Sequence, residues 1–148
     1  MLISTLTNTI THRSIDSLMG SGASKHMMIY KESFVNVFEH ESPQKVKLGD
    51  DYQYPIKGSG ESSYKLDSGK SLKMKDVLYV PGLKKNLLSI SALDTKGIGV
   101  SFVDGQVLMW PGGKTIEDAT MIGEEDKGLY KIKGQPKQHV GRRVSGPE

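Results

Sequence analysis

Residues 19–27 read Met-Gly-Ser-Gly-Ala-Ser-Lys-His-Met, and this stretch organises the rest of the chain. Gly20 and Gly22 flank a serine, residues 14–19 before them can run extended, and residues 29–38 after them are rich in apolar and aromatic side chains. Glycine allows two backbones to approach closely, and it tolerates a positive φ angle. The pattern predicts a tight, buried loop at the end of a strand. Taken alone, the same residues would also suit a plain hairpin turn.

Length and composition indicate one soluble globular domain. The chain has 148 residues, of which 36% are hydrophobic and 25% charged, and no apolar run approaches the roughly 20 residues of a membrane span. Cysteine is absent, which excludes disulfides and thiolate metal sites and fits a reducing compartment. The four histidines lie far apart in the sequence, so we expect no metal and no other cofactor.

The charge pattern argues against a nucleic-acid partner. The formal net charge is +3, and most of it lies in the tail, where Lys137, Arg142 and Arg143 outnumber Glu148. The body of the chain is therefore close to neutral. Because no basic cluster with interleaved aromatics stands out, we expect no nucleic-acid binding, and no membrane binding either.

Short strands separated by turns fill most of the chain. Alternating or apolar segments predict strands at residues 45–48, 54–57, 64–66, 72–80, 100–103, 106–110, 115–122 and 128–133. Leu87, Ile90 and Leu93 recur at helical spacing before Gly97, which predicts one short helix. The glycine- and serine-rich residues 58–63 predict a hairpin tip. This pattern favours an all-β barrel or sandwich.

Three segments follow from this division. Residues 1–13 are a strand or a flexible start, residues 14–133 form the domain, and residues 134–148 form a flexible tail without apolar periodicity.

Four features in a fixed order resemble a known family. They are the Gly-Ser-Gly-Ala loop at 20–23, Ile-Lys-Gly-Ser-Gly at 56–60, Asp-Val-Leu-Tyr-Val-Pro-Gly-Leu at 76–83, and Lys-Lys-Asn-Leu-Leu-Ser-Ile-Ser-Ala-Leu at 84–93. Together they resemble the retropepsin-like domain in the Pol polyprotein of Copia-type LTR retrotransposons of plants, over about residues 14–133. The resemblance implies a small closed β-barrel with a flap hairpin, one short helix and, here, extra C-terminal strands.

The resemblance also implies a site and a partner. Such domains are homodimeric aspartic proteases, in which each protomer supplies one Asp-Ser-Gly loop to a shared site. The implied catalytic positions are Gly20, Ser21 and Gly22. The implied substrate-binding residues are Ala23, Lys57, Gly58, Ser59 and Gly60, with residues 58–63 as the flap over the peptide. The start of the helix is expected at residues 86–89.

The chain departs from the family at the position that matters most for chemistry. Gly20 stands where the family has the catalytic aspartate, and a glycine can neither hold the shared proton nor orient water. Asp16 lies four residues upstream, about 13 Å along an extended strand, which is too far to replace the aspartate. Ser21 has no histidine partner in a recognisable arrangement, so a serine nucleophile is not expected.

Three functions stay open from the sequence. The favoured one is a catalytically silent, retrotransposon-derived module that dimerises with itself or with a related protease domain, or binds peptide. The second is an active aspartic endopeptidase that processes the polyprotein, with Gly20 an engineered or isolated change. The third is a structural β-barrel module of a Pol polyprotein. The expected location is the cytoplasm, or a virus-like particle if the chain belongs to a retrotransposon polyprotein.

Overall fold

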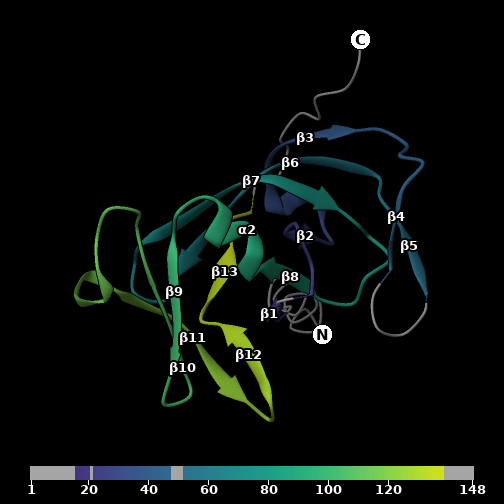
Figure 1. The fold of residues 1–148 in the computed structure, drawn as a ribbon. Helices are drawn as coiled ribbons and strands as arrows, with labels where there is room; N and C mark the ends of the chain where they lie inside the picture. The colour runs from purple at the N-terminus through teal and green to yellow at the C-terminus, as the bar shows by residue number, and fades with distance from the viewer. Residues whose placement is uncertain (1–15, 21, 48–51, 139–148) are drawn as a thin grey trace, which may run out of the picture.

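Short strands build almost the whole molecule (Figure 1). The computed structural model describes residues 16–20, 22–47 and 52–138. The strands are β1 (Ser17–Gly20), β2 (Met27–Met28), β3 (Phe34–Glu39), β4 (Lys45–Lys47), β5 (Gln53–Pro55), β6 (Gly58–Leu66), β7 (Ser71–Tyr79), β8 (Asn86–Ser89), β9 (Gly99–Val103), β10 (Gln106–Trp110), β11 (Thr120–Asp126), β12 (Leu129–Ile132) and β13 (Gly134–Pro136). The helical segments are η1 (Lys31–Ser33), α2 (Ile90–Thr95) and η2 (Ile116–Asp118). In the described part of the chain no helix is long and apolar enough to cross a membrane.

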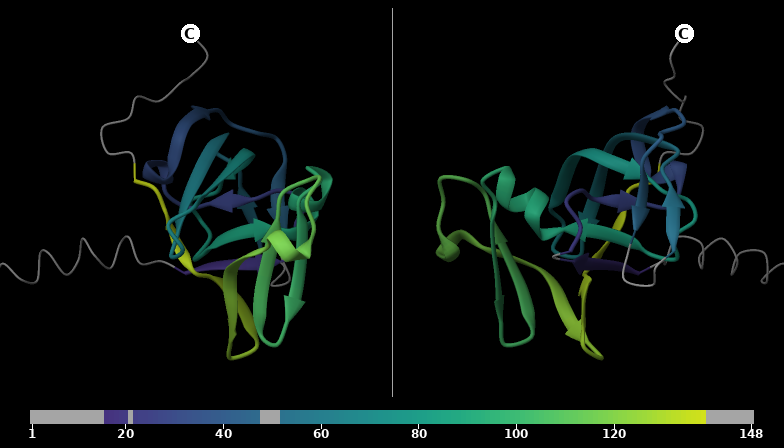
Figure 2. Two further views of the ribbon diagram at one scale, coloured as in Figure 1. Left: turned by 90° about the vertical axis from the view of Figure 1, so that its left-hand side faces the viewer. Right: turned by 45° about the vertical axis from the view of Figure 1, so that its right-hand side comes forward.

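The two longest strands, β6 and β7, form a hairpin near one end of the larger sheet. These two strands run antiparallel, joined by a turn in which Gly69 adopts a φ of +95°. The sheet continues in the order β13-β6-β7-β2-β8-β1-β12-β11-β10-β9, and β3 pairs separately with β6. The hairpins formed by β9, β10 and β11 lie on one side of the molecule, and β3 to β7 lie on the other (Figure 2).

The prediction of a mostly β fold with one short α-helix is confirmed for the described residues, whereas the closed barrel is not seen. The large sheet has two ends, β9 and β13, and no hydrogen-bonded ladder between residues that the structure describes joins them. β4 and β5 form a second sheet of their own. The chain passes directly from β12, which pairs with β1, into β13, which pairs with β6. This backbone link spans the sheet without closing it.

The segment at residues 86–89 is a strand rather than the start of a helix, so that prediction was wrong. β8 pairs in parallel with β1, which holds Leu87 and Leu88 extended. The helix begins only at Ile90, because Ser89 is extended and its side chain caps the first turn by accepting a hydrogen bond from the Ala92 N–H.

The predicted hairpin at residues 58–63 is also wrong. These residues lie inside β6, which pairs with β3 on one side and β7 on the other. A Cβ at Gly58 would lie 2.7 Å from the Phe38 carbonyl oxygen, and one at Gly60 would overlap the carbonyl oxygen of Asn36. The glycines are therefore needed because the backbone of β3 lies close to β6 here, and not because the chain turns.

The C-terminal part of the sheet differs from the predicted boundaries. Residues 116–118 form η2, and the strand that was expected from residue 115 begins at Thr120. Residues 134–136, which the sequence assigned to the tail, form β13. Residues 1–15 and 139–148 lie outside the described residues.

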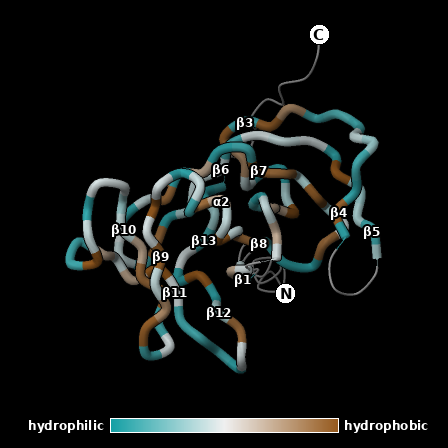
Figure 3. Tube along the Cα trace, in the orientation of Figure 1, coloured by the Kyte–Doolittle hydropathy of each residue, from teal (hydrophilic) through white to brown (hydrophobic). Residues whose placement is uncertain are grey.

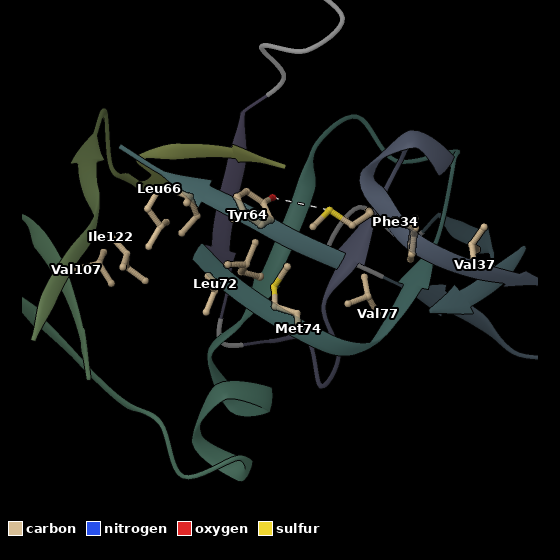
Figure 4. Packing of buried hydrophobic residues seen from close by; sticks show 12 residues of the cluster. Phe34, Val37, Tyr64, Leu66, Leu72, Met74, Val77, Val107 and Ile122 are labelled. Carbon is tan, nitrogen blue, oxygen red and sulfur yellow. Dashed lines mark hydrogen bonds between the residues drawn. The ribbon is translucent and has the colours of Figure 1, made fainter. Parts of the chain in front are cut away.

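The main core lies beneath the β6–β7 hairpin. Figure 4 shows Tyr64, Leu66, Leu72 and Met74 of that hairpin packed together with side chains from β3, β10 and β11. Alternate residues of β7 are buried, as expected for a strand with one face on a core. Apolar and polar segments accordingly alternate along the trace (Figure 3). A second cluster, which includes Ala23, Met27, Val46 and Val80, lies next to the loop after β1.

Candidate functional site

The loop after β1 lies where β1 and β8 end side by side. Gly20 is the last residue of β1, and its register partner is Ser89 in the parallel strand β8. A Cβ at Gly20 would lie 3.0 Å from Cδ1 of Leu87, the far end of a flexible side chain. A side chain at this position therefore requires only a rotation of Leu87. Ser21 lies outside the described residues.

Ser89 holds this loop in place. Its buried hydroxyl donates a hydrogen bond of 2.6 Å to the Ala23 carbonyl oxygen while it accepts one from the Ala92 N–H at 3.0 Å. One side chain thus joins the loop to the first turn of α2. Ser89 is the last residue of the Asn-Leu-Leu-Ser segment at 86–89, which carries part of the family resemblance. Nothing in the sequence itself indicates that Ser89 holds the loop.

His26 makes a second connection between the loop and β8. Its Nδ1 accepts a hydrogen bond of 2.9 Å from the Ser89 N–H, and its carbonyl oxygen accepts one of 2.9 Å from the Leu78 N–H. The side chain is 4% exposed. Burial disfavours the charged imidazolium and lowers the pKa of His26 from 6.5 to about 4. The imidazole is therefore neutral at pH 7, with its proton on Nε2.

Asn86 continues the network beneath the loop. Its Oδ1 accepts a hydrogen bond of 2.9 Å from the Ile29 N–H, and its Nδ2 donates one of 3.3 Å to the Ser17 hydroxyl. The Ser17 hydroxyl also bonds to the Tyr64 hydroxyl, which donates to the Met28 sulfur at 3.8 Å. Burial raises the pKa of Tyr64 above its usual range. The polar groups of four strands are thus paired inside the core, which fixes the base of the loop.

A cavity of about 720 Å³ opens beside the loop, and we name it the loop cavity. It brings together three of the predicted site residues: Gly22, Ala23 and Ser59. The other described site residues do not line it: Gly20, Lys57, Gly58 and Gly60. Lys57 instead forms an ion pair with Glu41, with 3.4 Å between Nζ and Oε2. Gly58 and Gly60 face the backbone of β3.

The hairpin that borders the loop cavity is β4–β5. Lys45, Val46 and Lys47 of β4 all line it, together with Ile56, which follows β5. Among the described residues, this hairpin forms a two-stranded sheet of its own, apart from the large one. The sequence placed a covering hairpin at residues 58–63. Residues 58–63 and the β4–β5 segment both contain turn-forming residues, so the sequence does not distinguish them. The pairing of β3 with β6 shows that residues 58–63 belong to a strand.

Asp76 is the single carboxylate among the described residues that line the loop cavity. It is exposed and adopts a positive φ of 56°, at a point where the pairing of β6 with β7 shifts register. Asp16 is held elsewhere by Lys131 and Lys85, with nitrogen–oxygen distances of 3.2 and 3.6 Å. The described part of the chain contains no group of three or more His, Asp or Glu side chains that could hold a metal ion.

Fold and site define a mainly β module in which a hydrogen-bonded glycine loop lies beside a cavity that the β4–β5 hairpin also borders. The sequence model of one family, the Pol polyprotein beta-barrel domain, matches residues 18–98, which is more than half of the chain. The chain belongs to that family and is a retrotransposon Pol-derived domain. No curated protein and no solved structure matches it.

Proposed function

We propose that the chain is a catalytically silent, retropepsin-like domain of a Copia-type retrotransposon Pol polyprotein of plants, and that it binds peptide in the loop cavity as one half of a dimer. The partner is a second copy or a related protease domain, in the cytoplasm or in a virus-like particle. The proposal is supported above all by the loop cavity, which adjoins the glycine loop and has Asp76 as its single described carboxylate.

The chemistry of aspartic proteases explains why this arrangement favours binding over cleavage. Two carboxylates about 3 Å apart share one proton, so that one activates water while the other polarises the carbonyl. Each half of a dimer would supply one of them from the loop position of Gly20. With glycine there, a peptide can still lie in the cavity, and no group at that position accepts the proton of water.

The β4–β5 hairpin is suited to cover a bound peptide. It lines the loop cavity through Val46 and two lysines, and it pairs with no other strand in the described part of the chain. We assign to it the flap role that the family resemblance implied for residues 58–63. Ala23, Gly22 and Ser59 then form the opposite wall of the cavity.

Cleavage activity tests the silence directly. The unmodified chain and its Gly20→Asp variant are compared on peptide substrates at mildly acidic pH, with and without a transition-state inhibitor of aspartic proteases. Leu87 can move aside for the new side chain, so we expect the variant alone to cleave and the inhibitor to stop it. Cleavage by the unmodified chain would contradict the proposal and favour the active-enzyme alternative, as would an aspartate codon at position 20 in the natural coding sequence.

Peptide binding and dimerisation need their own measurements. Gly22 has open space around its Cα, so Gly22→Leu should fill the cavity and weaken peptide binding at least fivefold in a titration followed by NMR. Ser68→Leu, in an exposed turn between β6 and β7, is the matched control. Sedimentation of the chain alone and mixed with the Gly20→Asp variant tests the dimer.

The structural-module alternative is favoured by one observation. Gly58 and Gly60 are paired on both sides within the large sheet, which fits a scaffold better than a moving part. This alternative replaces the proposal if neither chain cleaves and, in addition, either no peptide binds or Gly22→Leu leaves peptide binding unchanged.

A further inference from the structure

A second cavity lies between α2 and β7, on the other side of the loop after β1. It has a volume of about 480 Å³, and we name it the helix cavity. Its apolar surface comes from Met74 of β7, Leu93 of α2 and their neighbours. It meets the loop cavity at Ser24, Lys25 and Asp76, which line both. A cavity of this size suits a small ligand or a few residues of a peptide.

Four lysines from three separate parts of the chain line the helix cavity. Lys25 comes from the loop, Lys73 and Lys75 from β7, and Lys96 from the end of α2. All four are exposed, and none forms an ion pair with another described residue. Asp76 is the one acidic side chain in the lining. Because ammonium groups outnumber carboxylates four to one, the cavity attracts anions.

The floor of the cavity adds a fixed hydrogen-bond donor. His26 lines the cavity, is 4% exposed, and uses Nδ1 to accept the Ser89 N–H. Its proton therefore lies on Nε2. The Nε2–H is a donor from a residue that lines the cavity, and an acceptor on a ligand can meet it. The other lining residues are apolar side chains, the four lysines, Ser24, Thr95 and Asp76.

We propose that the helix cavity binds an acidic peptide segment, in which carboxylates meet the lysines and His26 Nε2–H while an aliphatic side chain packs on Met74 and Leu93. The apolar walls suit the aliphatic side chains of such a segment, and the lysines suit its carboxylates. A single-stranded nucleic acid would also match the charge. However, it gains much of its affinity by stacking bases on aromatic rings or arginine, and among the lining residues no aromatic ring other than the imidazole and no arginine is found.

This site adjoins the peptide site proposed above, but the inference does not depend on that function. Gly22 lines the loop cavity and not the helix cavity. The Gly22→Leu variant should therefore keep its affinity for an acidic peptide even where it loses binding in the loop cavity.

An NMR titration of the full chain tests the proposal. The probes are acetyl-Leu-Glu-Leu-Glu-amide and the matched glutamine peptide acetyl-Leu-Gln-Leu-Gln-amide. We expect the acidic peptide to shift the backbone amides of residues 73–76 and 92–96 and the side-chain nitrogen signals of His26. The glutamine peptide should bind at least tenfold more weakly, and added salt should weaken the acidic peptide.

Two double variants with equal charge identify the site. Lys73→Gln with Lys96→Gln should weaken the acidic peptide at least fivefold. Lys65→Gln with Lys114→Gln removes two exposed lysines that do not line the cavity, and it should leave the affinity unchanged. All of these lysines are exposed, so loss of folding is not expected in either variant.

Each contrary result overturns the proposal. Equal binding of the two peptides, equal losses in the two double variants, or no binding of the acidic peptide at millimolar concentration would each do so. If an eight-residue oligothymidylate binds more tightly than the acidic peptide and shifts the same signals, the ligand of the cavity is a single-stranded nucleic acid and not a peptide. Inorganic phosphate that binds as tightly as the peptide would reduce the site to a simple anion site.

Discussion

The Nδ1 atom of His26 lies 2.9 Å from the backbone nitrogen of Ser89 and accepts its hydrogen bond, although the two residues are 63 positions apart. The bond joins the glycine loop to the end of β8, where the Ser89 hydroxyl also holds Ala23. Because the acceptor must be unprotonated, the geometry of the loop depends on the neutral state of one buried imidazole.

The first prediction concerns the dependence of stability on pH. Burial lowers the pKa of His26 from 6.5 to about 4 in the folded state, so between these values the unfolded chain binds a proton that the folded chain does not. The contribution of His26 is therefore fully present above pH 6.5, decreases as the pH falls, and is lost below about 4. We expect a total loss of about 3 kcal/mol, measured by urea unfolding across this range.

A pair of histidine variants isolates this effect from the carboxylates. His26→Gln should be less stable at pH 7.5 and should lose stability less steeply between pH 6.5 and 4. His40→Gln removes a half-buried histidine and should keep the slope of the unmodified chain. If both variants show the same slope as the unmodified chain, His26 is not the group responsible.

The second prediction concerns the buried hydroxyl of Tyr64. Tyr64→Phe removes a partner of Ser17 in the network that joins β1, β6 and β8. We expect the free energy of unfolding to fall by about 1–3 kcal/mol, because a buried polar group loses a hydrogen bond. Tyr130→Phe, at a half-buried position on β12, should change it by less than about 0.5 kcal/mol. Equal effects of the two variants would argue against a special role for the network.

The third prediction tests why β6 contains Gly60. In Gly60→Ala the new methyl group overlaps the Asn36 carbonyl oxygen, so β3 must move away from β6. Overpacking of this kind costs about 1–3 kcal/mol, which thermal and urea unfolding would detect. Gly22→Ala, where a Cβ meets open space, serves as the control and should be close to neutral. A neutral Gly60→Ala would instead fit a mobile hairpin at this position.

The fourth prediction uses the single tryptophan of the chain as a probe. Trp110 of β10 lies opposite Gly99 of β9, and a Cβ at Gly99 would overlap the indole ring. Gly99→Val should displace the ring toward solvent and shift its fluorescence emission to longer wavelength. Ser101→Val adds a similar side chain on the same strand and should leave the spectrum unchanged. An unshifted spectrum in Gly99→Val would show that the ring does not pack there.

Local signals in the sequence were sufficient to predict several turns and the mainly β character of the fold. The Asp104–Gly105 pair forms the predicted hairpin between β9 and β10, and Gly97 follows the predicted helix with a φ of +81°. Both depend on residues close together in the chain, where glycine can adopt the conformation that the turn requires.

The errors came from contacts between distant segments. Leu87 has helical spacing with Ile90 and Leu93, but the parallel pairing of residues 86–89 with β1 makes that segment a strand. Gly58 and Gly60 resemble turn residues in the sequence, but in the structure they lie against the backbone of β3. No local pattern indicates either pairing, because each depends on residues about twenty or more positions away.

The candidate site was only partly accessible for the same reason. The family resemblance placed Gly22 and Ala23 in a substrate site, but it could not show that β4 borders the cavity that they line. The lysines of the helix cavity are spread from residue 25 to residue 96, so they form no cluster along the chain. The signal that could have located the loop was Ser89, a capping residue just before an apolar helical stretch.

The pairing of β1 with β12 has a consequence for how such domains can be exchanged between polyproteins. The family match ends at residue 98, yet β1 has β12 as its second neighbour and β6 has β13. A piece excised at the family boundary would leave both strands with bare edges that invite aggregation. Any transplant that is to remain folded must therefore include the chain through β13, and recombination is expected to be tolerated beyond that strand rather than at the edge of the recognisable sequence.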